Sequence, residues 1–273
     1  MEQLHGANIY EAAKPLFVDS EENSHYVTLA RTRLAYSKLV NSLKNPFKII
    51  LLHGRPGTGK SYLLYKFYQD FKERYPMFLF KTPTFNDRYA LMEVYKRLFG
   101  DEPPADATMH WLLEAFGKWE GEPIYILLDE AQLYTTEDME WIRILSNEAV
   151  FKFIISVHKV HEEDILAKAH FKTRTFETIE FRPIDPQEIP MYIEQKLAGA
   201  GLKDLLALFT PKNFRAIYRH TDGNLRNINR LMHRLLEMLG YLHAQRPFKL
   251  GSHLSNKYID MAAMDLELTH GTF

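Results

Sequence analysis

Short apolar runs alternate with stretches of helical periodicity over the first two thirds of the chain. The runs are typical of buried strands, and the stretches between them repeat apolar residues three or four positions apart, as on one face of a helix. The expected strands cover 48–53, 77–81, 124–129, 152–157 and 177–181. The expected helices cover 60–74, 87–99, 106–119, 136–148 and 161–170. This alternation predicts an α/β fold with a doubly wound, mostly parallel sheet.

Strand signals stop after residue 182, and helix-start signals take over. Asp185-Pro186-Gln187-Glu188 has the layout of an N-cap, a proline in the first turn and a capping-box acid, and Thr210-Pro211 repeats the start signal. A long apolar-striped stretch covers 225–244, and Ser255-Asn256 is expected to cap a last short helix. We therefore expect two domains, an α/β core over 1–184 that includes an N-terminal leading segment, and a helical domain over 185–273.

One loop carries recognisable chemistry. The residues after the first expected strand fill the template G-x-x-x-x-G-K-[ST], and the last two open a helix: Gly54, Arg55, Pro56, Gly57, Thr58, Gly59, Lys60 and Ser61. Glycines let the backbone curl so that successive N–H groups and the helix N-terminus point at an anion. The lysine would reach the outer phosphates, and the serine hydroxyl would be a ligand of Mg²⁺. A P-loop that binds a nucleoside triphosphate with magnesium is the prediction.

Two acids end the third expected strand, Ile124-Tyr125-Ile126-Leu127-Leu128-Asp129-Glu130. The carboxyl ends of parallel strands form the ligand-binding edge of a doubly wound sheet. We expect Asp129 to hold magnesium, directly or through water, and Glu130 to orient or deprotonate the attacking water.

Composition and charge exclude only a few kinds of partner and location. Thirty-four Lys and Arg against 35 Asp and Glu give a formal charge of -1, so no global basic field favours nucleic acid or an anionic membrane. The chain has no cysteine and therefore no disulfide framework. No apolar run approaches the roughly 18 residues that span a bilayer. We expect a cytoplasmic protein that meets the inner membrane only through a partner.

The loop, the run Leu127-Leu128-Asp129-Glu130-Ala131-Gln132 and the helical C-terminal part together resemble a P-loop ATPase of the AAA+ class. Within that class the chain is most similar to the ExeA/GspA and MshM group of bacterial secretion and pilus ATPases, and more distantly to the transposition ATPases TniB and TnsC. The most specific stretches are 179–184 with 200–202, and 208–210 with 223–231. The group usually has Gly-x-Pro-Arg-x-Ile-Asn in the last stretch, where this chain has Leu225 in place of the proline.

The resemblance implies further site residues. Arg226 matches the sensor-2 position, where a guanidinium contacts the γ-phosphate. His158 closes the fourth expected strand at the sensor-1 position, which commonly holds Asn or Gln, and Ser156 is a weaker substitute for that role. Arg174 is the expected arginine finger for a neighbouring subunit's ATP, which makes a homo-oligomer the expected state. Rival finger residues are Lys172, Arg182 and Arg143. Phe17 and Val18 match a segment that packs near the adenine in similar ATPases.

Three functional hypotheses follow. The first is an oligomeric Mg-ATPase that powers or regulates a larger assembly, by resemblance a secretion or type IV pilus machine. The second is a DNA-bound, ATP-dependent regulator of the transposition type, for which basic residues of the helical part could meet phosphates: Lys212, Arg215, Arg219, Arg226, Arg230 and Arg234. The third is a nucleotide switch that hydrolyses weakly, which the histidine at position 158 keeps open.

Overall fold

The computed structural model describes residues 8–18, 27–82, 88–158, 176–245 and 253–268. The chain divides into two compact units. One unit is Leu34–Phe181, and the other joins Met1–Arg33 to Arg182–Phe273.

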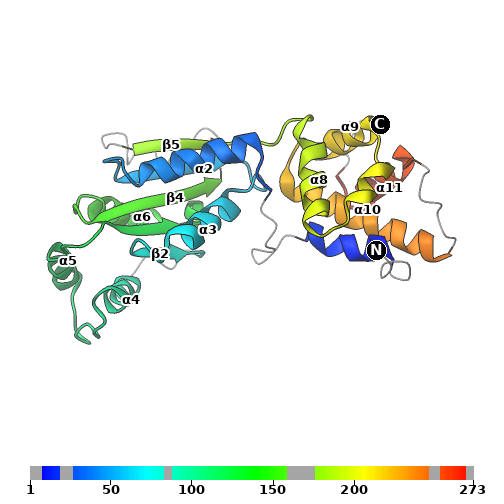
Figure 1. The fold of residues 1–273 in the computed structure, drawn as a ribbon. Coiled ribbons are helices and arrows are strands. Elements are labelled where there is room, and N and C mark those ends of the chain that lie inside the picture. Colours follow the sequence, from blue (N-terminus) through cyan, green and yellow to red (C-terminus); the bar gives the residue numbers. More distant parts are fainter. Residues whose placement is uncertain (1–7, 19–26, 83–87, 159–175, 246–252, 269–273) are drawn as a thin grey trace. The chain divides into compact units, whose positions relative to one another are not determined.

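The first unit contains one five-stranded sheet in the order β2-β3-β4-β1-β5 (Figure 1). All neighbouring strands pair in parallel. The strands are β1 Ile49–Gly54, β2 Met77–Phe80, β3 Ile124–Leu128, β4 Phe151–His158 and β5 Phe176–Phe181. All five lie where the apolar runs predict them, and the doubly wound α/β fold is confirmed.

Helices connect and cover these strands. They are α2 Ala30–Ser42, α3 Lys60–Phe71, α4 Arg88–Phe99, α5 Met109–Gly117, the 3₁₀ turn η2 Ala131–Leu133, and α6 Thr136–Leu145. Residues 161–170, where the sequence predicts a further helix, lie outside the described residues. The polar helix α2, ahead of β1, was not predicted.

The sheet is buried on both faces, which explains why β1 and β3 appear in the sequence as continuous apolar runs rather than alternating ones. Every residue of β3 is buried. Ile49 and Leu51 of β1 share one apolar cluster with residues of α4, α5 and α6. Leu63, Leu64 and Phe67 of α3, which packs against β1 and β4, are also buried.

The second unit is helical. Its elements are α1 Ile9–Ala13, the 3₁₀ turn η1 Lys14–Phe17, α8 Glu188–Gly199, the 3₁₀ segment η3 Lys203–Leu208, α9 Pro211–Thr221, α10 Leu225–Gln245 and α11 Asn256–Asp265. The start signals at Thr210 and Ser255 behave as expected, but α8 begins at Glu188 with Gln187 as its N-cap, not at Pro186 with Asp185 as its N-cap. The reason is a turn in which the Glu188 N–H donates to the Asp185 carbonyl at 2.9 Å. Thr210 and Asn213 form a capping box at the start of α9, and Ser255 caps α11.

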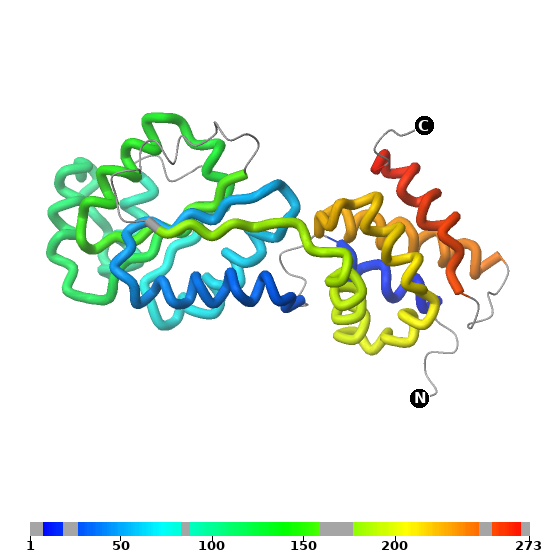
Figure 2. The backbone as a smooth tube through the Cα atoms, turned by 90° about the horizontal axis from the view of Figure 1, so that it is seen from above, coloured from blue at the N-terminus to red at the C-terminus, as the bar shows by residue number. Residues whose placement is uncertain are grey.

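The N-terminal segment belongs to this helical unit (Figures 1 and 2). Tyr10 and Phe17 are buried in its apolar cluster. The side-chain amide of Asn8 donates to the Gly240 carbonyl at 3.0 Å, and Lys196 Nζ donates to the Leu16 carbonyl at 2.7 Å. The sequence-based division, which attached residues 1–33 to the core, differs from the structure because this segment buries its apolar residues against α8 and α10.

Candidate nucleotide site

The loop between β1 and α3 has the backbone that its glycines allow. Gly57 and Gly59 have positive φ angles of 78° and 96°, which glycine adopts without steric cost. Thr58 is buried, and its hydroxyl donates to the Arg55 carbonyl at 2.8 Å, which closes the turn. Gly59 is the N-cap of α3 and makes no side-chain capping hydrogen bond. The N-terminus of a helix is a favourable place for an anion, because its N–H groups point outward along the helix axis.

Lys60 lies inside this loop. It is only 3% exposed, and Nζ donates to the carbonyl oxygens of Gly54 at 2.9 Å and Arg55 at 3.0 Å. A buried ammonium needs such acceptors, because burial without partners costs several kcal/mol or more. The lysine is thus held at the position from which phosphate oxygens would compete for its protons. Ser61 follows it as the second residue of α3.

The two acids follow β3 at the same edge of the sheet. Asp129 is 7% exposed, its N–H continues the ladder to the Phe80 carbonyl at 2.9 Å, and its Oδ1 accepts from the Glu130 N–H at 3.0 Å. Glu130 has a left-handed backbone with φ 52°, uncommon for a residue with a side chain. Such conformations cost on the order of 1–3 kcal/mol and concentrate at functional sites.

Strand β4 lies between β3 and β1 and brings His158 to both. His158 is the register partner of Gly54, the first residue of the loop. Its Nε2 lies 3.2 Å from Glu130 Oε1. The Gln132 side chain, on η2, contacts both residues: Oε1 accepts from the His158 N–H at 3.0 Å, and Nε2 donates to Glu130 Oε2. Glu130 and His158 therefore lie side by side next to the start of the loop, and Gln132 contacts both of them.

The residues fit magnesium and a nucleoside triphosphate. The hydroxyl of Ser61 and the carboxylate of Asp129 supply the hard oxygen ligands that Mg²⁺ prefers. Strand spacing of about 4.8 Å places the ends of β3 and β1 roughly 10 Å apart with β4 between them.

The approach of the Phe181 backbone to Gly54 leaves no room for a side chain there, since an added Cβ would lie 2.2 Å from the Phe181 carbonyl oxygen.

The structure describes some of the residues expected as arginine finger or sensor 2. Arg174 and Lys172 lie outside the described residues. Arg143, on α6, is bound within its own chain, because Nε donates to Glu140 Oε1 at 2.6 Å. This hydrogen bond raises the pKa of Arg143. Arg226 is exposed and is the second residue of α10.

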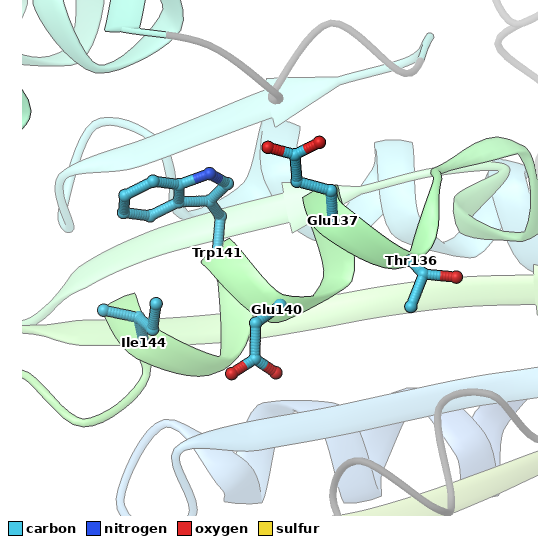
Figure 3. A pocket seen from close by; sticks show the side chains of 5 residues that line it. All are labelled: Thr136, Glu137, Glu140, Trp141 and Ile144. Carbon is cyan, nitrogen blue, oxygen red and sulfur yellow. The ribbon is translucent and has the colours of Figure 1, made fainter.

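A pocket of about 580 Å³ lies elsewhere, against α6 (Figure 3). All of its lining residues come from that helix: Thr136, Glu137, Glu140, Trp141 and Ile144. None of them belongs to the loop or to the acids after β3. It is therefore a separate hollow from the candidate nucleotide site.

Comparisons with known proteins bear on the fold that carries this site. A family model described as AAA domain matches residues 45–166, which include the loop, both acids and His158. No curated protein matches the sequence. The structure is similar to Cdc6p from Pyrobaculum aerophilum, with a TM-score of 0.65, 17% identity, and coverage of 95% of this chain and 72% of that one.

Two further solved structures are similar. The Orc1 protein of Aeropyrum pernix in complex with DNA gives a TM-score of 0.60 and 14% identity, over 93% of this chain and 69% of that one. The Thermotoga maritima RuvB Holliday junction branch migration motor gives 0.53 and 12%, over 92% and 73%. The chain thus has the AAA+ P-loop fold, with a C-terminal helical region that fits a lid. These findings do not confirm the ExeA/GspA and MshM group, which stays a prediction.

Within the described residues, no helix is long and apolar enough to cross a membrane.

Proposed function

We propose that the chain binds ATP with magnesium through residues 54–61 and hydrolyses it. The observation that carries the proposal is the buried Lys60 at the end of a glycine-rich loop. This loop follows β1, whose neighbour β4 brings His158 to Glu130. In this assignment Lys60 binds the outer phosphates, and Ser61 and Asp129 hold the metal.

The proposed reaction is the attack of water on the γ-phosphorus. The oxygen of the water bonds to the γ-phosphorus while Glu130 accepts a proton from the water. At the same time the bond between the phosphorus and the leaving oxygen of ADP breaks. Bound Mg²⁺ would neutralise charge on the phosphates. His158, beside Glu130, takes the sensor-1 position, and Arg226 is proposed to couple the helical unit to the nucleotide.

A neighbouring subunit is proposed to complete the site. Arg174 is the proposed finger, with Lys172 and Arg182 as rivals, while Arg143 already has an acid partner in its own chain. A guanidinium supplied across an interface can add about 10³–10⁵-fold to turnover.

ATP turnover per subunit, measured across a wide range of protein concentration, tests this proposal. Turnover should rise with concentration in the wild type and fall by at least about 100-fold in Glu130→Gln, with nucleotide binding retained. A rate that is flat and equal in both proteins would instead identify a switch that binds nucleotide without appreciable hydrolysis.

We also propose DNA as the partner, with ATP regulating its binding. One similar structure was solved with DNA, and another is a Holliday junction branch migration motor. On α9, Lys212 and Arg215 are exposed and have no ion-pair partner among the described residues. Phosphates are the chemistry that such cations suit. A secretion or pilus assembly remains the alternative partner, and it rests on sequence resemblance alone.

Measuring the binding of duplex DNA distinguishes the two candidate partners, DNA and a secretion or pilus assembly. With ATP present, affinity for a fluorescent duplex should fall steeply with salt, and Lys212→Ala/Arg215→Ala should weaken it and reduce the salt slope by about 2. The matched control is Lys44→Ala/Lys118→Ala, which removes two exposed cations from the core unit. Equal binding by both double variants would exclude this face of α9.

A further inference from the structure

The side-chain amide of Gln132 makes contacts that only one arrangement of hydrogens satisfies. The backbone N–H of His158 can only donate, so the Gln132 atom 3.0 Å from it must be the carbonyl Oε1. The amide nitrogen Nε2 then carries two hydrogens. One is donated to Glu130 Oε2, and the other points at His158 Nδ1, 3.4 Å away.

This arrangement decides the protonation of the histidine ring. Because Nδ1 faces an N–H donor, it must present its lone pair, and the ring hydrogen must lie on Nε2. Nε2 is the atom 3.2 Å from Glu130 Oε1. The imidazole can therefore donate to the carboxylate as a neutral group, and the three side chains close a ring of hydrogen bonds in which each donor has an acceptor.

The ring engages both oxygens of Glu130. The carboxylate is 29% exposed, so water still reaches it, and each oxygen keeps a further lone pair for a proton. Its orientation, however, is fixed by two donors, one of which depends on the tautomer that Gln132 imposes. Fixing the orientation of a general base lowers the entropic cost of reaching the reactive geometry.

We infer that Gln132 is a positioning residue, which holds His158 in the Nε2–H tautomer and through it, and directly, orients the Glu130 carboxylate for proton transfer. The inference rests on the proposed ATPase function for its kinetic consequence. The tautomer itself does not depend on that function.

The test compares Gln132→Met, which keeps the length of the side chain but removes both donors and the acceptor, with Leu133→Met. Leu133 is the neighbouring residue on η2 and is 60% exposed, so it is a matched control. Nitrogen-15 NMR of histidine-labelled protein reports the tautomer, and His158→Asn identifies the signal among the 12 histidines. Steady-state turnover gives kcat and KM for ATP.

We expect the Nε2–H tautomer at His158 in the wild type and in Leu133→Met, and a mixture with the Nδ1–H tautomer in Gln132→Met. In the same variant kcat should fall about 10- to 100-fold. KM should change less than about twofold, because a positioning residue acts after substrate binding.

An Nδ1–H tautomer in the wild type, or unchanged tautomer and kcat in Gln132→Met, would overturn the inference. A wild type that lacks turnover would instead count against the proposed function, and the tautomer measurement would still decide whether the ring exists.

Discussion

The carbonyl oxygen of Phe181 lies against Gly54 so closely that a Cβ on Gly54 would be 2.2 Å away from it. The last residue of β5 thus limits the first residue of the nucleotide loop to glycine. Gly54→Ala must push the two backbones apart, and we expect a loss of about 2–3 kcal/mol in the free energy of unfolding, together with weaker nucleotide binding. Urea unfolding and nucleotide titration measure the two effects.

Gly117→Ala is the control for that change. Gly117 ends α5, and a Cβ there meets no atom within 4 Å. Alanine should therefore be neutral, or stabilise by up to about 1 kcal/mol. Equal effects of the two substitutions would mean that the close approach at Gly54 does not affect the free energy of unfolding.

Ser156 provides a second prediction. It is 1% exposed, and its Oγ has no hydrogen-bond partner among the described residues. Removing an unsatisfied buried hydroxyl relieves its desolvation cost, so Ser156→Ala should raise the free energy of unfolding by about 1 kcal/mol. Thermal unfolding of the nucleotide-free protein measures the change.

Ser146→Ala is the counterpart, because the Oγ of Ser146 donates to the Arg143 carbonyl at 2.8 Å and the residue is equally buried. There we expect a loss of about 1 kcal/mol. A loss at Ser156 as large as that at Ser146 would show that its hydroxyl does have a partner in solution.

Tyr125 makes stability depend on alkaline pH. Burial raises the pKa of its phenol to about 12, with smaller contributions from Tyr75 and Glu122. In the unfolded chain a tyrosine loses its proton near pH 10. Between these values the folded state holds one more proton than the unfolded state, so the free energy of unfolding should fall as pH rises, by about 2–3 kcal/mol in total.

Tyr125→Phe should remove that slope. It also removes the hydrogen bond from the phenol to the Leu43 carbonyl at 3.2 Å, which should cost about 1 kcal/mol at neutral pH. The difference between the two proteins, followed by urea unfolding from pH 8 to 11, should therefore shrink as pH rises. A constant difference would contradict the assignment.

Asn213 joins two elements of the helical unit. It forms the capping box with Thr210, and its amide nitrogen donates to the Leu254 carbonyl at 3.0 Å and to Asn256 Oδ1 at 2.6 Å. Since it is 1% exposed, Asn213→Ala would leave these groups without partners, and we expect a loss of about 2–3 kcal/mol. Hydrogen exchange of the α9 amides measures it.

The neighbouring Lys212 is exposed, and Lys212→Ala should change stability by no more than about 0.5 kcal/mol. Similar exchange rates in the two variants would show that the link to the segment before α11 is not stabilising.

The sequence predicts the strands and the loop well because their determinants are local. A parallel strand buried on both faces, such as β3, needs a continuous apolar run, and the loop needs glycines at the positions where φ is positive. Helix α2 escapes prediction because few of its apolar residues are buried: Ala35 and Leu39 are, while Leu34 is 61% exposed. Its pattern is therefore too sparse to indicate a helix.

Contacts between distant residues are not visible in any local pattern. Lys196 would be expected at the surface of α8, yet it is 7% exposed, lies over the rings of Phe17 and Tyr192, and donates to Leu16. The role inferred for Gln132 likewise depends on the register that brings the end of β4 beside η2. Neither could be found without the fold.

The pairing of Leu16 with Lys196, 180 positions apart, has a consequence for the order in which the protein folds during synthesis. The core unit is one continuous segment, and all its strands have been made once residue 181 has been translated. The helical unit needs both its early and its late residues, so its first helix has no apolar partner until α8 and α10 emerge from the ribosome. We therefore expect the nucleotide loop to form on the nascent chain before the helical unit has closed.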